Sequence, residues 1–374
     1  MSMKASIEQT ELFRAMGRVQ SIVERRTTIP ILSNVLIETR DDQLFLRTTD
    51  LDIEVLDKVK ATVEIPGALT VGANTLYEIV KKLPDGSLIQ LSGDSGSSQL
   101  EISASRSRFF LSTLPKEDFP IMASEEYEND FTVKAKVIKR LFDKSKFAMS
   151  SEETRYYLNG VYLHPYQEEG KNFLRAVATD GHRLAQIDVE TPGGLETFTG
   201  VIVPKKTVSE LRMVLETEND EISISISSNK IRISNETVTL TSKVVDGTFP
   251  DYKRVIPVNN EKKLIVKATE FSEAVDRVST VSSDRSRAVK LSLSSGKLHL
   301  SVNSPENGKA EDELLVDYSD DTLEIGFNAR YLQELTSQVD GDRVEFSFKS
   351  SGDPALMRDV DDAGATYVVM PMRV

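Results

Sequence analysis

The chain has 374 residues, three histidines, no cysteine and a formal net charge of −13 at pH 7. The lack of cysteine excludes disulfides, thiolate metal sites and thiol nucleophiles, as is typical of proteins of a reducing cytoplasm. No apolar run predicts a signal peptide or a membrane span, and the acidic balance argues against nucleic-acid binding unless basic residues gather on one face.

The first third of the chain predicts a strand at 3–7 and then a helix at about 8–24. Leu12, Met16 and Val19 lie on one face of this helix. Alternating apolar residues at 35–49 predict a hairpin. The segment Leu69–Leu83 then has alternating apolar residues, a short polar break and an amphipathic helical pattern. A strand followed by a helix is therefore expected twice in this third of the chain.

Two further stretches repeat this plan. Strands are predicted at 131–134 and 264–267, each followed by a helix, and the segments Val201–Leu215 and Leu323–Val339 match Leu69–Leu83. The copies lie about 130 and about 120 residues apart, far more than the spacing of solenoid repeats. We therefore predict an α+β chain of three repeated domains, 1–125, 126–257 and 258–374, each with two similar halves.

A basic amphipathic helix is predicted at about 136–146. It has Lys136, Lys139, Arg140 and Lys144 on one side and apolar residues on the other. One such helix alone is more often an ordinary solvated face than a phosphate-binding one. The other predicted helices also carry basic residues, which favours phosphate contact. These residues are Arg14, Arg18, Lys81, Lys82, Lys205, Lys206, Arg212 and Arg277.

Arginines follow the first helix in two of the repeats. Arg26 stands there in the first repeat, and Arg155, Tyr156 and Tyr157 stand at the matching place in the second. A guanidinium beside aromatic rings suits contact with phosphates and base faces. A hairpin end with core tyrosines explains the local sequence as well.

Asp180 and His182 could act as the helper and base of a hydrolase, with a serine supplied from elsewhere. No nucleophile elbow, zinc motif or nucleotide-binding loop accompanies them, so a tight turn held by these side chains is the favoured interpretation. Asp50, Asp52 and Glu54 alternate, and a strand would place all three on one face. A solvated sheet face explains that pattern better than a site for a hard metal ion.

The C-terminal residues are unusually apolar. Tyr367–Val369 predict a final core strand, and Met370 and Met372 lie beyond it. Methionine side chains at an exposed edge suit a groove that accepts several apolar ligands, because they are flexible and polarisable.

Five segments together resemble the bacterial DNA polymerase III beta subunit, the sliding clamp or processivity factor. They are RFFLSTLPKEDFP (108–120), RYYLNG (155–160), ATDGHRLA (178–185), VDGTFPDYKRV (245–255) and YVVMPMR (367–373). The resemblance covers essentially the whole chain. It implies three equivalent clamp domains, with helices lining the inside and antiparallel sheets outside, and a head-to-tail homodimer that closes a six-domain ring.

The resemblance also implies the function. A ring of this family encircles duplex DNA and tethers the replicative polymerase and other DNA-processing proteins, without catalysis and without a cofactor. The implied partners are double-stranded DNA of any sequence, a second copy of the chain, the clamp loader, a replicative polymerase subunit and other replication or repair proteins with short clamp-binding motifs. No membrane partner is implied, and the expected location is the cytoplasm.

Residues are assigned to the implied sites by motif. Arg26, Tyr156 and Tyr157 are expected to touch DNA, and helix placement adds Lys81, Lys82, Lys139 and Lys205. A pocket between the second and third domains is expected to take short peptides, often with a Gln and a Leu-Phe ending. Its residues are Leu158, Thr179, Gly181, His182, Arg183, Leu184, Pro250, Arg254, Val255, Val368, Met370, Pro371, Met372 and Arg373.

The dimer seam is expected to join Phe109 and Leu111 of one chain to the segment at Thr280 and Val281 of the other. The last two replace the bulky aliphatic residues of a well-represented family pattern. Two other function classes stay open on the residues alone: a hydrolase built on Asp180 and His182, and a multivalent scaffold of three repeats with no DNA function. Segregated basic helices would argue against the scaffold.

Overall fold

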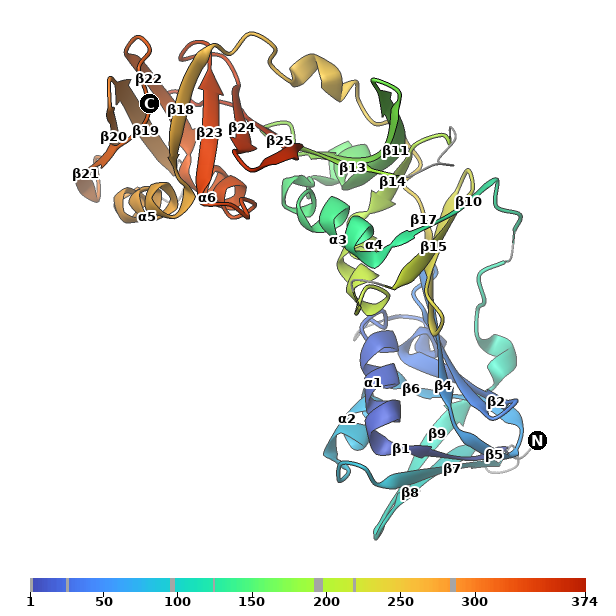
Figure 1. The fold of residues 1–374 in the computed structure, drawn as a ribbon. Coiled ribbons are helices and arrows are strands. Elements are labelled where there is room, and N and C mark those ends of the chain that lie inside the picture. The colour runs from blue at the N-terminus through green and yellow to red at the C-terminus, as the bar shows by residue number, and fades with distance from the viewer. Residues whose placement is uncertain are drawn as a thin grey trace. The chain divides into compact units, whose positions relative to one another are not determined.

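The computed structural model describes residues 3–24, 27–94, 98–123, 125–191, 198–217, 220–282 and 287–374. These residues fold into two compact units (Figure 1). Unit 1 comprises Met1–Lys139 and Lys206–Val244, and unit 2 comprises Arg140–Lys205 and Val245–Val374. Both units combine helices with antiparallel sheet.

The strand-then-helix copies predicted from the sequence are present. In each copy the helix begins at the residue that directly follows the strand. The copies are β1 (Met3–Glu8) with α1 (Gln9–Val19), β6 (Gly67–Gly72) with α2 (Ala73–Lys82), β10 (Asn129–Lys134) with α3 (Ala135–Asp143), β14 (Val201–Pro204) with α4 (Lys205–Glu210), β18 (Lys262–Lys267) with α5 (Ala268–Ser279), and β22 (Leu323–Asn328) with α6 (Ala329–Thr336).

The first helix is shorter than predicted. It ends at Val19, whereas the apolar pattern continues to Val23. The amide of Val23 donates to the carbonyl of Gln20 at 3.3 Å, which closes a turn. Ile22 and Val23 are buried through this turn instead of through another turn of helix. Apolar periodicity alone does not distinguish the two, because both bury the same side chains.

Unit 1 is built on one continuous sheet. The order of its described strands is β10-β15-β16-β17-β4-β3-β2-β6-β9-β8-β7-β1-β5. The remaining elements are η1 (Pro30–Ser33), β2 (Asn34–Arg40), β3 (Gln43–Thr49), β4 (Ile53–Lys60), β5 (Thr62–Ile65), β7 (Leu88–Asp94), β8 (Gln99–Ala104), β9 (Ser107–Leu114), η2 (Lys116–Asp118), η5 (Leu211–Met213), β15 (Glu221–Ile226), β16 (Lys230–Ser234) and β17 (Val238–Lys243).

Unit 2 contains two sheets. The described strands follow the orders β14-β11-β12-β13-β25-β24-β23-β18 and β21-β20-β19-β22. The remaining elements are η3 (Lys146–Ala148), η4 (Glu153–Leu158), β11 (Gly160–Glu168), β12 (Lys171–Thr179), β13 (Arg183–Glu190), η6 (Tyr252–Val255), β19 (Ala288–Ser294), β20 (Lys297–Ser304), β21 (Gly308–Leu315), β23 (Arg343–Phe348), β24 (Ala355–Asp359) and β25 (Asp362–Val369).

The middle third of the chain contributes strands to both units. In unit 1, β17 pairs with β4, with Ser242 opposite Ile53. In unit 2, β25 pairs with β13, with Val369 opposite Arg183. Each repeat is thus joined to the next by an antiparallel strand pair, which explains why two compact units are found where the sequence has three repeats.

The helices of a repeat pack in pairs against the sheet. In unit 1, α1 contacts α2 and lies against β3 and β4, and in unit 2, α5 contacts α6 and lies against β20 and β21 (Figure 1). The core under them is apolar, with Leu12, Met16 and Phe271 among the fully buried side chains. Burial of such side chains is the main driving force for this arrangement.

Candidate functional site

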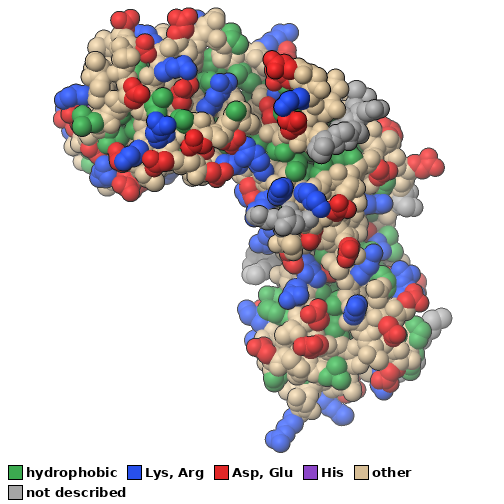
Figure 2. Space-filling view, viewed as in Figure 1, with side chains coloured by type: hydrophobic (Ala, Val, Ile, Leu, Met, Phe, Trp, Pro, Cys, Tyr) green, Lys and Arg blue, Asp and Glu red, His purple; other side chains and the backbone are tan. Residues whose placement is uncertain are grey.

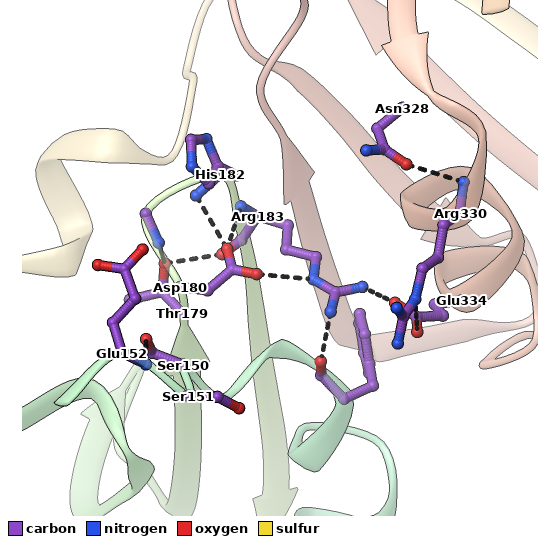
Figure 3. A network of polar contacts seen from close by, with 12 residues as sticks. Ser150, Ser151, Glu152, Thr179, Asp180, His182, Arg183, Asn328, Arg330 and Glu334 are labelled. Carbon is purple, nitrogen blue, oxygen red and sulfur yellow. Dashed lines mark hydrogen bonds and ion pairs between the residues drawn. The ribbon is translucent and has the colours of Figure 1, made fainter. Parts of the chain in front are cut away.

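The turn between β12 and β13 is held by its own side chains (Figure 3). Thr179 Oγ1 donates to the carbonyl of Arg183 at 2.7 Å and accepts from the amide of Gly181 at 3.1 Å. Asp180 Oδ1 accepts from the amides of His182 at 2.9 Å and Arg183 at 3.0 Å. Gly181 has a φ of 88°, a conformation that costs glycine little. The predicted tight turn is present and Asp180 holds it, but Thr179 is the second side chain that does so, whereas the His182 ring lies against Tyr331.

This geometry does not fit the hydrolase alternative. Besides the two amides, the Asp180 carboxylate accepts from Arg183 Nε at 3.1 Å, so both of its oxygens hold the turn. The His182 ring stacks on Tyr331, with ring centroids 6.4 Å apart and an angle of 24° between the planes. Asp180 therefore positions the backbone instead of orienting an imidazole for proton transfer.

The geometry of Asp50, Asp52 and Glu54 does not fit the alternative of a hard-metal site either. Asp50 and Asp52 precede β4, so they do not share a strand face with Glu54, which lies within it. Asp50 pairs with Lys206, Asp52 with Lys243 at 2.9 Å, and Glu54 with Arg47 at 2.6 Å. Across the described part of the chain, no group of three His, Asp or Glu residues could hold a metal ion.

Arg183 ties the turn to α6. Its side chain is 8% exposed and donates to the carbonyl of Phe147 at 2.7 Å and to Glu334. Its guanidinium also lies 4.5 Å from the ring centre of Tyr331. Burial raises the pKa of Glu334, but hydrogen bonds from Arg183 and Arg330 outweigh it and leave that pKa below its usual range. The Glu334 end of this ion pair is thus charged at neutral pH.

Leu184, which directly follows the turn, belongs to an apolar cluster. Leu158, Leu184 and Val368 come from η4, β13 and β25, and they are buried against Phe249 and Tyr252. Three of the predicted pocket residues therefore form one floor. Folding brings them together, although they are more than 20 residues apart in the chain.

Around this floor, several of the other predicted pocket residues are more accessible, whereas Thr179 and Arg183 are buried. Val255 is 50% exposed and Met370 is 40% exposed. The amide of Met370 donates to the carbonyl of His182 at 2.8 Å, which fixes the C-terminal segment against the turn. Pro250, Arg254 and Arg373 are also exposed, while Pro371 and Met372 are half-buried. We call the predicted pocket residues together the partner surface.

A second layer of side chains, missed from the sequence, supports η6. Tyr252 accepts from Arg175 Nη1 at 3.2 Å and lies 3.0 Å from His164 Nε2. Arg175 is buried and pairs with Asp188. Burial opposes the charge of Arg175, but the hydrogen bonds that it donates to Asp188 and Tyr252 raise its pKa above the usual range. A buried arginine on a strand is uncommon, and that signal was available in the pattern NFLRAVAT.

Family models match almost the entire chain. The N-terminal, central and C-terminal domains of the DNA polymerase III beta subunit match residues 3–123, 132–251 and 253–373. The chain belongs to the DNA polymerase III beta subunit family. It is therefore a sliding clamp, the non-catalytic processivity factor of the polymerase, built from three clamp domains.

Individual relatives support this membership over the full length of both chains. The beta sliding clamp of Caulobacter vibrioides is 48% identical over 372 residues, and that of Escherichia coli is 37% identical over 376 residues. Among solved structures, a Bartonella birtlesii sliding clamp bound to griselimycin has a TM-score of 0.97 at 48% identity. A Caulobacter crescentus clamp with polyethylene glycol at a putative beta-motif tethering region has a TM-score of 0.95, also at 48% identity. All four alignments cover 100% of both chains.

In this clamp the residues predicted to touch DNA lie on several elements. Tyr156 is 53% exposed. Tyr157 packs edge-on against it, with the two ring centroids 5.8 Å apart, and also borders the apolar floor. Lys81 and Lys82 form the last turn of α2 and are exposed. Lys139 is exposed on α3, and Lys205 donates to Ser151 Oγ at 2.7 Å. Arg26 lies outside the described residues.

The predicted basic face of the clamp's third helix is only partly solvent-facing. Arg140 pairs with Asp362 at 2.6 Å. Lys144 lies beyond the end of α3, is 9% exposed and pairs with Asp340 at 2.7 Å. The prediction that Lys144 belongs to the basic face of this helix is wrong, and Arg140 is half-buried, because carboxylates some 200 residues away in the chain engage both side chains. Lys136 and Lys139 remain on the exposed side.

The predicted seam residues occupy different elements of the clamp. Phe109 and Leu111 are half-buried on β9. Thr280 is exposed directly after α5, where its hydroxyl donates to the carbonyl of Asp276 at 3.2 Å, and Val281 follows it half-buried. The structure of one chain leaves the seam itself as a prediction.

Surface charge is mixed on the side shown in Figure 2, where basic and acidic side chains alternate over both units. In that view, basic side chains do not predominate on either unit. Within the part of the chain that the structure describes, none of the helices is both long and apolar enough to cross a membrane.

Proposed function

We propose that this clamp closes head to tail with a second copy and encircles duplex DNA in the bacterial cytoplasm. In that form it tethers the replicative polymerase and other proteins with short clamp-binding motifs. The observation that carries the proposal is the match to all three domain models of the family, from residue 3 to residue 373. We place the domains at 1–125, 126–257 and 258–374.

Contact with DNA in this proposal is electrostatic and independent of sequence. Arg26, Tyr156 and Tyr157 are assigned to this contact by motif, and the helix lysines Lys81, Lys82, Lys139 and Lys205 add positive charge. Phosphate contacts of this kind carry no sequence information and weaken with salt, which allows a ring to slide. Retention on DNA then depends on topology instead of affinity.

Two open sheet edges support ring closure. Beside its pairing with β8, β9 pairs with β6 only through Thr113 and Leu114, so residues 107–112 of β9 have a free edge among the described strands. Strand β21 is the last of its sheet, and Leu315 at its end is 80% exposed. Unpaired edges of this kind favour strand pairing with another chain. We propose that β9 of one copy and β21 of the next form the seam, with Thr280 and Val281 beside it.

The partner surface is proposed to take short linear motifs from the polymerase and the clamp loader. The buried floor offers an apolar base, and Val255 and Met370 offer adaptable apolar walls. Binding of a short peptide by an apolar floor with a polar rim is a common recognition mode.

The ring is tested by retention on DNA. The clamp is loaded with a matching clamp loader and ATP onto a nicked circular plasmid and onto the same DNA linearised. We expect retention on circles and loss from linear ends. Equal retention on both forms, or none on either with a loader shown to be active, would overturn the proposal.

The seam is tested by a pair of neighbouring variants. Leu111→Glu should convert the dimer to monomer in sedimentation velocity and abolish retention on circles, because the charge enters the seam. Ser112→Glu, on the opposite face of β9, should leave both unchanged. An unaltered dimer in Leu111→Glu would place the seam elsewhere.

A further inference from the structure

A second turn in the chain has the same construction as the turn of the partner surface. Between β3 and β4, Thr49 Oγ1 donates to the carbonyl of Ile53 at 2.8 Å and accepts from the amide of Leu51 at 3.0 Å. Asp50 Oδ1 accepts from the amides of Asp52 at 2.9 Å and Ile53 at 2.7 Å. Each of these bonds has a counterpart, between the same kinds of atom, in the Thr179–Arg183 turn.

The backbone of the two turns also agrees. Leu51 has a φ of 79° where Gly181 has 88°. A leucine in this region is strained, and strain retained at one position of a turn suggests a role for that position. The Leu51 side chain is 42% exposed, so burial of that side chain does not account for the strain.

The strand beside each turn repeats as well. The amide of Lys243 donates to the carbonyl of Asp52 at 2.9 Å, as the amide of Met370 does to the carbonyl of His182. Lys243 therefore stands at the end of β17 where Met370 stands at the end of β25. Both contacts lie where one repeat is joined to the next by an antiparallel strand pair.

The segment that passes each turn begins in the same way. Phe119 is buried and followed by Pro120, and Phe249 is buried and followed by Pro250. In unit 1, Pro120 and Ile121 line a cavity of about 220 Å³ together with Thr49, Leu51 and Lys243. The cavity is smaller than the roughly 300–1,000 Å³ of most small-molecule sites, so it suits one or two side chains of a peptide.

The chemistry of this cavity differs from that of the partner surface in one respect. Its apolar rim is exposed, with Ile121 57% exposed. At the position of Met370, however, it has the ammonium of Lys243, whose partner Asp52 is largely solvent-exposed. An exposed ion pair contributes little to stability, so an incoming carboxylate can replace Asp52. Lys230 nearby is held by Glu125 at 3.0 Å and stays part of the wall.

We propose that the junction of β3, β4 and β17 is a second docking site of the clamp. Its ligand is an extended segment of a partner protein with an apolar side chain followed by a carboxylate. The apolar side chain enters between Leu51 and Ile121, and the carboxylate pairs with Lys243. The residues of this site differ from those of the partner surface, and binding there requires neither DNA nor ring closure.

The probe is a synthetic eight-residue peptide that carries photo-leucine followed by two aspartates, irradiated with the full-length clamp. Mass spectrometry should place crosslinks on the tryptic peptide that contains Ile121. The yield there should fall about fivefold in Lys243→Glu, equivalent to the upper value for one exposed ion pair. It should fall at least as far in Ile121→Asp, because a carboxylate would then face the entering apolar side chain. Val255→Asp, at the partner surface, should leave it unchanged.

A charge exchange tests the assignment of Lys243. The same peptide with two lysines in place of the aspartates should label the wild-type clamp weakly and Lys243→Glu strongly. Lys243→Met, which copies the partner surface, should label equally with both peptides. Circular dichroism of each variant excludes misfolding as the cause.

Two results would overturn the proposal. One is labelling at Ile121 that does not respond to the charge at position 243 with either peptide. The other is a change in oligomeric state of Ile121→Asp in sedimentation velocity, which would show that a second copy of the chain covers this junction instead of a partner peptide.

Discussion

Arg175 and Asp188 form a bidentate ion pair on neighbouring strands, with an Nε–Oδ1 distance of 2.5 Å and an Nη2–Oδ2 distance of 2.8 Å. The Arg175 side chain is 5% exposed and also lies over the ring of Tyr166 at 3.4 Å. Through Nη1 it donates to the hydroxyl of Tyr252, the first residue of η6. A buried charge pair thus fixes the segment that carries Val255 to the sheet beneath it.

The first prediction concerns this pair. Arg175→Met should lower the free energy of unfolding by about 3 kcal/mol, because the half-buried Asp188 loses its cation and keeps only the hydrogen bond from Gln186. The double variant Arg175→Met/Asp188→Asn should recover most of that loss. Urea denaturation of the two single variants and the double variant measures the coupling. Additive losses in the double variant would show that the two side chains do not act as a pair.

His164 adds a pH dependence to the same cluster. Its Nδ1 lies 2.8 Å from the carbonyl of Pro165, and Arg175, Lys253 and Asp188 act on its charge. Burial is the main cause that lowers its pKa, and the two cations lower it further, against the raising effect of Pro165 and Asp188. Below the usual pKa of about 6.5, the unfolded chain therefore binds more protons at this residue than the folded one.

The second prediction follows from that sign. The contribution of His164 to stability is complete above about pH 6.5 and is lost as the pH falls toward its lowered folded pKa, with a slope of at most about 1.4 kcal/mol per pH unit. His164→Gln should show a flatter dependence of the unfolding free energy between pH 7 and 5. Parallel curves for the variant and the wild type would contradict it.

The third prediction compares the two equivalent turns. Gly181→Ala should cost about 1–2 kcal/mol, because alanine resists a φ of 88° and its Cβ would lie 2.6 Å from Arg155 Nη1. Leu51→Gly should be nearly neutral, since relief of strain offsets the loss of a partly buried side chain. Thermal unfolding of both variants provides the test. A costly Leu51→Gly would mean that the leucine is held by packing.

The sequence predicted the strand-helix copies well because their apolar residues repeat at short range. The sequence did not predict ion pairs or ring contacts whose two residues lie far apart in the chain. Arg140 and Lys144 follow the pattern of a solvated face, and only folding brings Asp362 and Asp340 to them. Tyr331, which stacks on His182, was missed because nothing in its own helix marks it as a neighbour of a turn about 150 residues earlier.

The segments TTDLDI and ATDGHR have different local patterns, because the first predicts a sheet face or a metal site and the second predicts a turn. Their bonds show one construction at both places. The shared Thr-Asp pair was the available signal, but Leu51 in place of Gly181 concealed it, because leucine does not predict a left-handed residue.

The fourth prediction concerns DNA. Lys81→Ala/Lys82→Ala should reduce the slope of log affinity against log salt for a short duplex by about 1–2, if each lysine neutralises one phosphate. Fluorescence anisotropy over a salt series measures it. Lys171→Ala/Lys297→Ala removes two lysines that are also exposed, but lie on the sheets, and should leave the slope unchanged. Equal slopes for both double variants would remove Lys81 and Lys82 from the proposed DNA contacts.

The last prediction concerns the partner surface. Val255 and Val258 are close in sequence and exposed at 50% and 87%, but only Val255 belongs to the predicted wall. Val255→Asp should weaken binding of a ten-residue peptide with a Gln and a Leu-Phe ending by at least about tenfold, because a carboxylate would be desolvated against the apolar side chains. Val258→Asp introduces the same charge on the same segment and should have little effect. Titration of labelled peptide into each variant gives the two affinities, and a similar loss in both would indicate general charge repulsion rather than a wall at Val255.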